Sequence, residues 1–153
     1  MCGEPAGEKP MVYTILLYAQ FVSAVAVFIM LFFVTAPYGR HLRGGWGPAL
    51  PARAGWLIME LPAVLVIALC FLQGDRHGDP AAIAFLALWE FHYIQRTFIF
   101  PFQLGTNRRF PVILVAFAFL FNIMNGYING AYLYTLSAPL TARWLLDPRF
   151  IIG

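Results

Sequence analysis

The sequence predicts an all-α fold, a polytopic membrane helix bundle with about four transmembrane helices in this chain. Of its 153 residues, 61% are apolar and only 11% are charged, whereas a soluble domain carries about 25% charged residues. The second observation is that the apolar residues are gathered in four long runs. Apolar side chains in runs of this kind are expected to face lipid rather than water.

Each run is long enough for a helix to cross the hydrocarbon core, which takes about 20 residues. The runs cover residues 11–34, 55–73, 80–104 and 110–136. The first exceeds the core of a signal peptide, about 7–15 residues, so we expect a retained helix. None shows the alternation of a membrane β-barrel. We therefore expect a single transmembrane domain over residues 1–153.

The arginines between the runs predict which ends face the cytoplasm. Arg40, Arg43 and Arg53 lie between the first and second runs, and Arg108 and Arg109 lie between the third and fourth. Because Lys and Arg concentrate on the cytoplasmic side, we expect the N-terminus outside or in the lumen. The host membrane is either a bacterial inner membrane or the endoplasmic reticulum.

The end of the chain predicts a further helix. Asp147 and Pro148 have the pattern of a helix start, since proline is favoured in the first turn. A new apolar run then opens at residues 150–152, just before the sequence stops. We interpret the chain as the first part of a longer protein.

Insertion of an ionisable side chain at the centre of a membrane-spanning helix costs about 2.5–3.5 kcal/mol of free energy. Such residues are therefore candidates for function. Glu60 lies near the start of the second run, close to Pro62, which loosens the backbone hydrogen bonding. A carboxyl buried there would keep its proton and could donate a hydrogen bond. The alternative is that Glu60 reaches the headgroup region, and we favour the functional interpretation.

The third run carries one polar face, because at about 100° per residue its polar side chains fall within one arc. That arc holds Glu90, His92, Tyr93, Arg96 and Thr97. The face is either wet or lined by a ligand, or it holds an ion pair that only supports the bundle, within the helix (Glu90–Arg96) or between helices. We favour support for Glu90, leave Tyr93 and Arg96 open, and expect His92 to be a satisfied core residue.

Asn122, Asn125 and Asn129 share one face of the fourth run, beside Gly126 and Gly130. Such amides hold membrane helices together at about 0.6–2 kcal/mol each, and small residues let the backbones approach. Contact between helices and contact with a ligand both remain open for the asparagines.

Other function classes find no support in the sequence. It has no glycine-rich nucleotide motif and no serine-nucleophile or zinc-protease motif. No run of basic residues indicates a nucleic-acid partner. The cysteines and histidines show no metal-ligand spacing, so we expect no metal.

Several blocks of the sequence, in the same order, resemble the first half of the steroid 5α-reductases (3-oxo-5α-steroid 4-dehydrogenases). They cover almost the whole chain after the first run. The blocks are residues 35–40 (TAPYGR), 45–48 (GWGP), 52–62 (ARAGWLIMELP), 91–98 (FHYIQRTF), 125–127 (NGY), 132–133 (YL) and 147–150 (DPRF).

The resemblance implies a seven-helix membrane enzyme that transfers a hydride from NADPH to the β-carbon of the enone in a 3-oxo-Δ4-steroid. In that family a Glu in a Glu-Leu-Pro motif and the Tyr of a His-Tyr motif hydrogen-bond the 3-keto oxygen. They correspond to Glu60 and Tyr93 here, as catalytic residues. Donors at that oxygen would stabilise the negative charge that hydride addition builds there. Trp56 would be a wall facing the steroid.

The same resemblance implies NADPH as the cofactor, with most of its site in the family's later helices. Within this chain, Arg96, Asn107 and Arg108 are expected near phosphate or amide groups of the cofactor. The chain would then supply the substrate-side half of a steroid reductase. Two alternatives stay open: a reductase of another lipid enone or a polyprenol, and a non-catalytic membrane protein or fragment.

Overall fold

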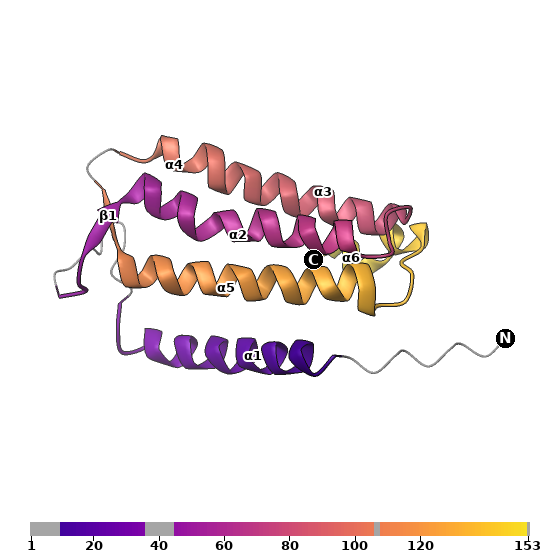
Figure 1. Ribbon diagram of the computed structural model, residues 1–153, viewed down its shortest axis with the longest axis horizontal. Coiled ribbons are helices and arrows are strands. Elements are labelled where there is room, and N and C mark those ends of the chain that lie inside the picture. The colour runs from indigo at the N-terminus through magenta and orange to yellow at the C-terminus, as the bar shows by residue number, and fades with distance from the viewer. Residues whose placement is uncertain (1–9, 36–44, 106–107, 153) are drawn as a thin grey trace.

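The computed structural model describes residues 10–35, 45–105 and 108–152. Three long helices lie side by side (Figure 1): α1 Met11–Leu31, α2 Ala52–Gln73 and α5 Val112–Ala131, which continues as the π-helical turn Tyr132–Leu136. By length and composition, all three can cross a membrane. The structure is thus all-α apart from one short β-ribbon, with the long apolar helices of a multi-pass membrane protein.

The third apolar run is helical, but it is not one uninterrupted α-helix. α3 Pro80–Ile94 has 15 residues and leads through the π-helical turn Gln95–Ile99 into α4 Phe100–Gln103. Pro101 has no N–H to donate to the carbonyl of Thr97, and its ring crowds that carbonyl, so the α-helical ladder is interrupted. Among the described residues this run is not a helix long enough to span, and a count of four spans stays a prediction.

A short antiparallel ribbon, which the sequence did not predict, joins the starts of α2 and α5. β1 Ala49–Pro51 pairs with β2 Arg109–Pro111, and Leu50 stands opposite Phe110. Each strand ends in a proline directly before its helix. The ribbon therefore holds the two helix starts next to each other and places Phe110 near the first turns of α2.

α2 and α5 pack closely because α5 presents glycines to α2. A Cβ built on Gly130 would stand 2.5 Å from the Cβ of Cys70, and one on Gly126 would stand 3.1 Å from the Cβ of Val66. Small residues at such a contact let two membrane helices approach. This packing fixes the face of α5 that is turned toward α2.

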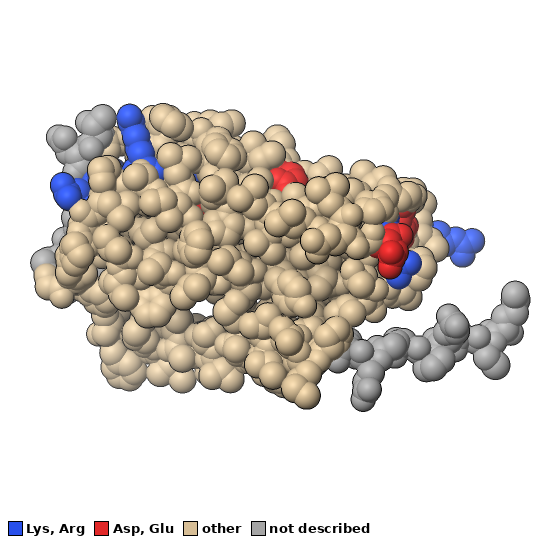
Figure 2. Space-filling view, in the orientation of Figure 1, with Lys and Arg blue, Asp and Glu red and all other residues tan. Residues whose placement is uncertain are grey.

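The outer surface of the helices is apolar. Tyr13 is the buried side chain of α1, and the rest of that helix is exposed or half-buried. In Figure 2 the charged side chains gather mainly at the two ends of the molecule, and the broad belt between them is uncharged apart from one acidic patch. Such a belt suits a lipid environment.

Asp147 directly precedes the short helix α6 Pro148–Ile152, in agreement with its sequence pattern. Its carboxylate accepts hydrogen bonds of 2.9 Å from the guanidinium and from the backbone N–H of Arg149. The guanidinium and the backbone N–H hold the pKa of Asp147 down at about 2. Asp147 therefore stays charged at neutral pH.

Candidate functional site

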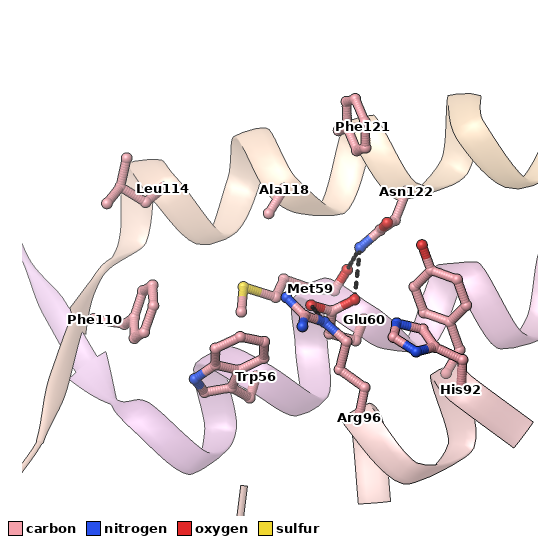
Figure 3. Close-up of a pocket in the computed structure, with 11 residues that line it drawn as sticks. Trp56, Met59, Glu60, His92, Arg96, Phe110, Leu114, Ala118, Phe121 and Asn122 are labelled. Atoms are coloured by element: carbon pink, nitrogen blue, oxygen red, sulfur yellow. Dashed lines mark hydrogen bonds and ion pairs between the residues drawn. The ribbon is translucent and has the colours of Figure 1, made fainter. Parts of the chain in front are cut away.

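A cavity of about 410 Å³ lies between α2, α5 and the end of α3 with its π-helical turn (Figure 3). Small-molecule pockets have volumes of about 300–1,000 Å³. Its lining combines an apolar wall with a few polar and charged groups. The lining residues are Trp56, Met59, Glu60, His92, Tyr93, Arg96, Phe110, Leu114, Ala118, Phe121 and Asn122.

An ion pair crosses the cavity between α2 and the π-helical turn. The Nε of Arg96 donates to Oε1 of Glu60 at 2.6 Å. The Glu60 side chain is 6% exposed and that of Arg96 is 42% exposed. The guanidinium also lies over the ring of Trp56, 4.7 Å from its centroid, so a cation–π contact adds to the charge pairing.

Asn122 of α5 binds the same carboxylate from the other side. Its Nδ2 donates to the carbonyl oxygen of Met59 at 2.6 Å and to Oε2 of Glu60 at 3.2 Å, as the dashed lines of Figure 3 show. A backbone carbonyl can only accept, so it fixes which end of the Asn122 amide faces α2. Asn122 is therefore a donor to Glu60, and the amide joins two helices.

These contacts change two expectations about charge. Glu60 accepts a hydrogen bond at both oxygens, which is the arrangement of a carboxylate and not of the proton donor that its burial predicted. Of the two ion pairs left open as structural alternatives, the one between helices forms. The Glu90–Arg96 pairing is wrong, since Arg96 pairs with Glu60 while Oε1 of Glu90 is buried without a partner in the part of the chain that the structure describes.

Tyr93 lines the cavity one helical turn before Arg96. It interacts electrostatically with Glu60 and Arg96, and its hydroxyl with the side chain of Asn125. Its ring lies 4.8 Å from that of Trp89, centroid to centroid. Tyr93 therefore has fixed neighbours on both sides.

His92 lies beside Tyr93, edge-on, with ring centroids 5.0 Å apart. It lines the cavity and is exposed in this chain. The expectation of a buried, satisfied core histidine is therefore wrong.

The three asparagines of α5 make two kinds of contact, with other helices and within α5. Asn122 bonds across to α2, as described above. Asn129 instead bonds within its own helix, its Nδ2 donating to the backbone oxygen of Asn125 at 2.8 Å and to Oδ1 of Asn125 at 3.0 Å. The expectation of contact between helices holds for Asn122 and also for Asn125, whose side chain interacts with the Tyr93 hydroxyl of α3. Asn129 sets the orientation of Asn125.

Comparison with known proteins agrees with the sequence blocks. No protein-family model matches the chain. It is 34% identical over 141 residues to steroid 5-alpha-reductase DET2 of Gossypium hirsutum, covering 90% of this chain and 55% of that protein. It is 35% identical over 145 residues to 3-oxo-5-alpha-steroid 4-dehydrogenase 1 of Bos taurus, with the same coverage. The human protein of that name is 32% identical over 143 residues, covering 90% of this chain and 54% of the human protein.

The chain belongs to the steroid 5α-reductase family. It spans about 55% of the length of the curated relatives it matches and corresponds to their N-terminal part. Glu60, Tyr93, Trp56 and Arg96, which the sequence singled out separately, lie around one cavity of this family member.

A second cavity of about 180 Å³ adjoins the first and shares Trp56 and Phe110 with it. Arg108 and Arg109 line this smaller cavity. Trp56 makes edge-on contacts with Phe100 at 4.9 Å and with Phe110 at 6.0 Å between ring centroids, so its indole separates the two spaces. Asn107, expected near a cofactor, lies outside the described residues.

Sequence reasoning missed the apolar wall of the cavity. Leu114, Ala118 and Asn122 recur every four residues on α5, and Phe121 adjoins them. That spacing places them on one helical face. The polar residue Asn122 at the end of this otherwise apolar face was the feature from which the cavity wall could have been predicted. Phe110 could not be found in this way, because its place depends on the β-ribbon.

Proposed function

We propose that this chain is the substrate-side part of a membrane-embedded, NADPH-dependent reductase of the Δ4 double bond of 3-oxo-steroids. The observation that carries the proposal is one cavity lined by Glu60, Tyr93 and Trp56, in a chain that belongs to the steroid 5α-reductase family. The cavity is apolar over Leu114 and Ala118 and polar at one side, which suits a rigid hydrocarbon with a single ketone.

The chemistry requires hydrogen-bond donors at the ketone. Addition of a hydride to the β-carbon pushes the electron pair of the double bond toward the ketone oxygen, and a proton then adds at the α-carbon. Preorganised donors at that oxygen stabilise the developing charge. Tyr93 carries a suitable proton on its hydroxyl, and the apolar wall with Trp56 would hold the ring system and exclude water.

Glu60 needs a change of partner before it can serve as such a donor. In this structure Arg96 and Asn122 both donate to it. The donor role that the family resemblance implies for Glu60 therefore requires Arg96 to turn away from the carboxyl group. Glu60 would then stand beside Tyr93 at the ketone oxygen.

NADPH would supply the hydride. The described residues fit parts of this cofactor: Arg96 at the main cavity and Arg108 at the smaller one offer cations to phosphate or amide groups. These cavities do not by themselves provide for a whole dinucleotide. We propose that most of its contacts come from the part of the family fold that this chain does not span.

The membrane arrangement is a further part of the proposal. Residues 80–104 would form the third of four spans, tolerated in lipid because the π-helical turn keeps the backbone hydrogen-bonded within the bundle. The N-terminus would lie outside or in the lumen, with Arg53 and Arg108 on the cytoplasmic side, in a bacterial inner membrane or the endoplasmic reticulum. This chain would contribute four of about seven helices.

Ligand binding tests the proposal without the rest of the enzyme. The chain would be reconstituted in lipid nanodiscs and titrated with a 3-oxo-Δ4-steroid and with the matched steroid that lacks the 3-keto oxygen. We expect the ketone to bind at least about ten-fold more tightly, and Tyr93→Phe to remove most of that difference. Equal affinity of the wild-type chain for the two steroids would contradict the proposed function. Met124→Leu, a volume-conserving change outside the cavity lining, serves as the control.

A further inference from the structure

The Tyr93 hydroxyl can both accept and donate, but it has one proton. A neighbour that donates to its oxygen leaves that proton for another partner, and a neighbour that accepts from it uses the proton up. Tyr93 lines the cavity on one side and meets the Asn125 side chain on the other. The orientation of the Asn125 amide therefore decides where the proton points.

That orientation is fixed by a chain of contacts within α5. The backbone oxygen of Asn125 can only accept, so the Asn129 atom 2.8 Å from it is the donor Nδ2. The same Nδ2 lies 3.0 Å from the side chain of Asn125, which must present its acceptor Oδ1 there. The amide end left for Tyr93 is the donor Nδ2.

We propose that Asn125, oriented by Asn129, is a positioning residue that donates to the Tyr93 hydroxyl and so directs the Tyr93 proton into the cavity. The proposal concerns the same cavity and rests on the proposed function in assigning a ketone as the recipient. It also specifies the ligand chemistry at this point. The group that meets Tyr93 must be an acceptor, such as a ketone oxygen, and a group that only donates is rejected.

Asn125→Asp is the informative variant. It keeps the shape of the side chain but replaces the donor Nδ2 with an acceptor, so the Tyr93 proton should turn away from the cavity and toward residue 125. Asn129→Ala is a second variant that introduces no charge and only releases the Asn125 amide. Met124→Leu on the same helix is the matched control.

The first measurement needs no steroid. Ultraviolet resonance Raman spectra of the chain in nanodiscs, minus those of Tyr93→Phe, report through the tyrosine ring modes whether the Tyr93 oxygen accepts a hydrogen bond or only donates. We expect an accepting oxygen in the wild type and in Met124→Leu, and a donor-only signal in Asn125→Asp. A donor-only signal in the wild type, or an unchanged accepting signal in Asn125→Asp, overturns the proposal.

The second measurement links the orientation to the ligand. We expect Asn125→Asp to weaken binding of a 3-oxo-Δ4-steroid about ten-fold, Asn129→Ala to weaken it less, and the double variant Asn125→Asp/Tyr93→Phe to bind like Tyr93→Phe alone. Additive losses in the double variant would show that Asn125 acts independently of Tyr93 and overturn the proposal. An accepting Tyr93 in a chain that binds no keto-steroid would support the orientation and refute the proposed function.

Discussion

The Nε of Arg96 lies 2.6 Å from Oε1 of Glu60 and links the π-helical turn to α2 inside the cavity. The link places a full carboxylate where the proposed reaction needs a donor, and it stacks the guanidinium on Trp56. The same pair is therefore a structural contact between helices and, under the proposed function, a group that must rearrange for chemistry.

Removal of both partners of the pair should destabilise the chain by less than the sum of the two single removals. Loss of one member of a buried pair costs about 3–5 kcal/mol, and less here because Arg96 is half-exposed. We expect Arg96→Gln to lower the Tm of the chain in detergent by several degrees, and Glu60→Gln/Arg96→Gln to lose less than the two single changes added together. Additive losses would show that the two side chains are not coupled. Arg96→Lys should not restore the wild type, because it lacks the Nε and the planar stacking surface.

Pro101 should determine the position of Arg96. An alanine at position 101 regains the N–H that can donate to Thr97, so the π-helical turn can return to α-helical geometry. The side chain of Arg96 would then rotate about the helix axis, away from Glu60. We expect the coupling energy between positions 60 and 96, measured by a double-mutant cycle, to fall by at least half in a Pro101→Ala background. An unchanged coupling energy would mean that Pro101 does not hold the turn.

The sequence predicted the helices far better than their contacts. Hydropathy located the runs that became α1, α2 and α5 because burial in lipid depends on composition, and their bounds differ from the expected ranges by a few residues. It did not detect the interruption of the third run, because Pro101 alters hydrogen-bond register without altering hydropathy. The short β-ribbon has too few residues for a pattern.

In the cavity too, the sequence predicted which residues share a helical face but not which residues they contact. Periodicity correctly placed Tyr93 and Arg96 on one face of a helix, yet it left open whether Arg96 pairs with Glu90 of the same run or with a residue of another helix. The true partner, Glu60, depends on how α2 is rotated against the π-helical turn, and no single-sequence pattern contains that rotation. The resemblance to a family supplied the proposed roles of Glu60 and Tyr93, which remain predictions.

Glu60→Gln should separate binding from chemistry. Glutamine keeps the shape and still accepts from Asn122, and its own N–H can reach a ketone, so steroid affinity should change less than about three-fold. Turnover with NADPH in the complete reductase should fall at least about ten-fold, because the amide is a weaker donor to the developing charge than a carboxylic acid. Steroid binding to this chain and NADPH oxidation by the complete enzyme measure the two effects. Near-normal turnover would remove Glu60 from the proposed mechanism, and a matched loss in binding and turnover would make it a binding residue only.

The contact between α2 and α5 should be intolerant of a single added methyl group. A Cβ at Gly130 would lie 2.5 Å from the Cβ of Cys70, which is too close without movement of one helix. Such overpacking costs about 1–3 kcal/mol, so we expect Gly130→Ala to lower the Tm of the chain by several degrees. Gly78→Ala is the control, because a Cβ there meets no atom within 4 Å. In the double variant Gly130→Ala/Cys70→Gly, removal of the Cys70 side chain should restore part of the lost Tm. A Gly130→Ala chain that is as stable as the wild type would show that α2 and α5 are further apart than the structure places them.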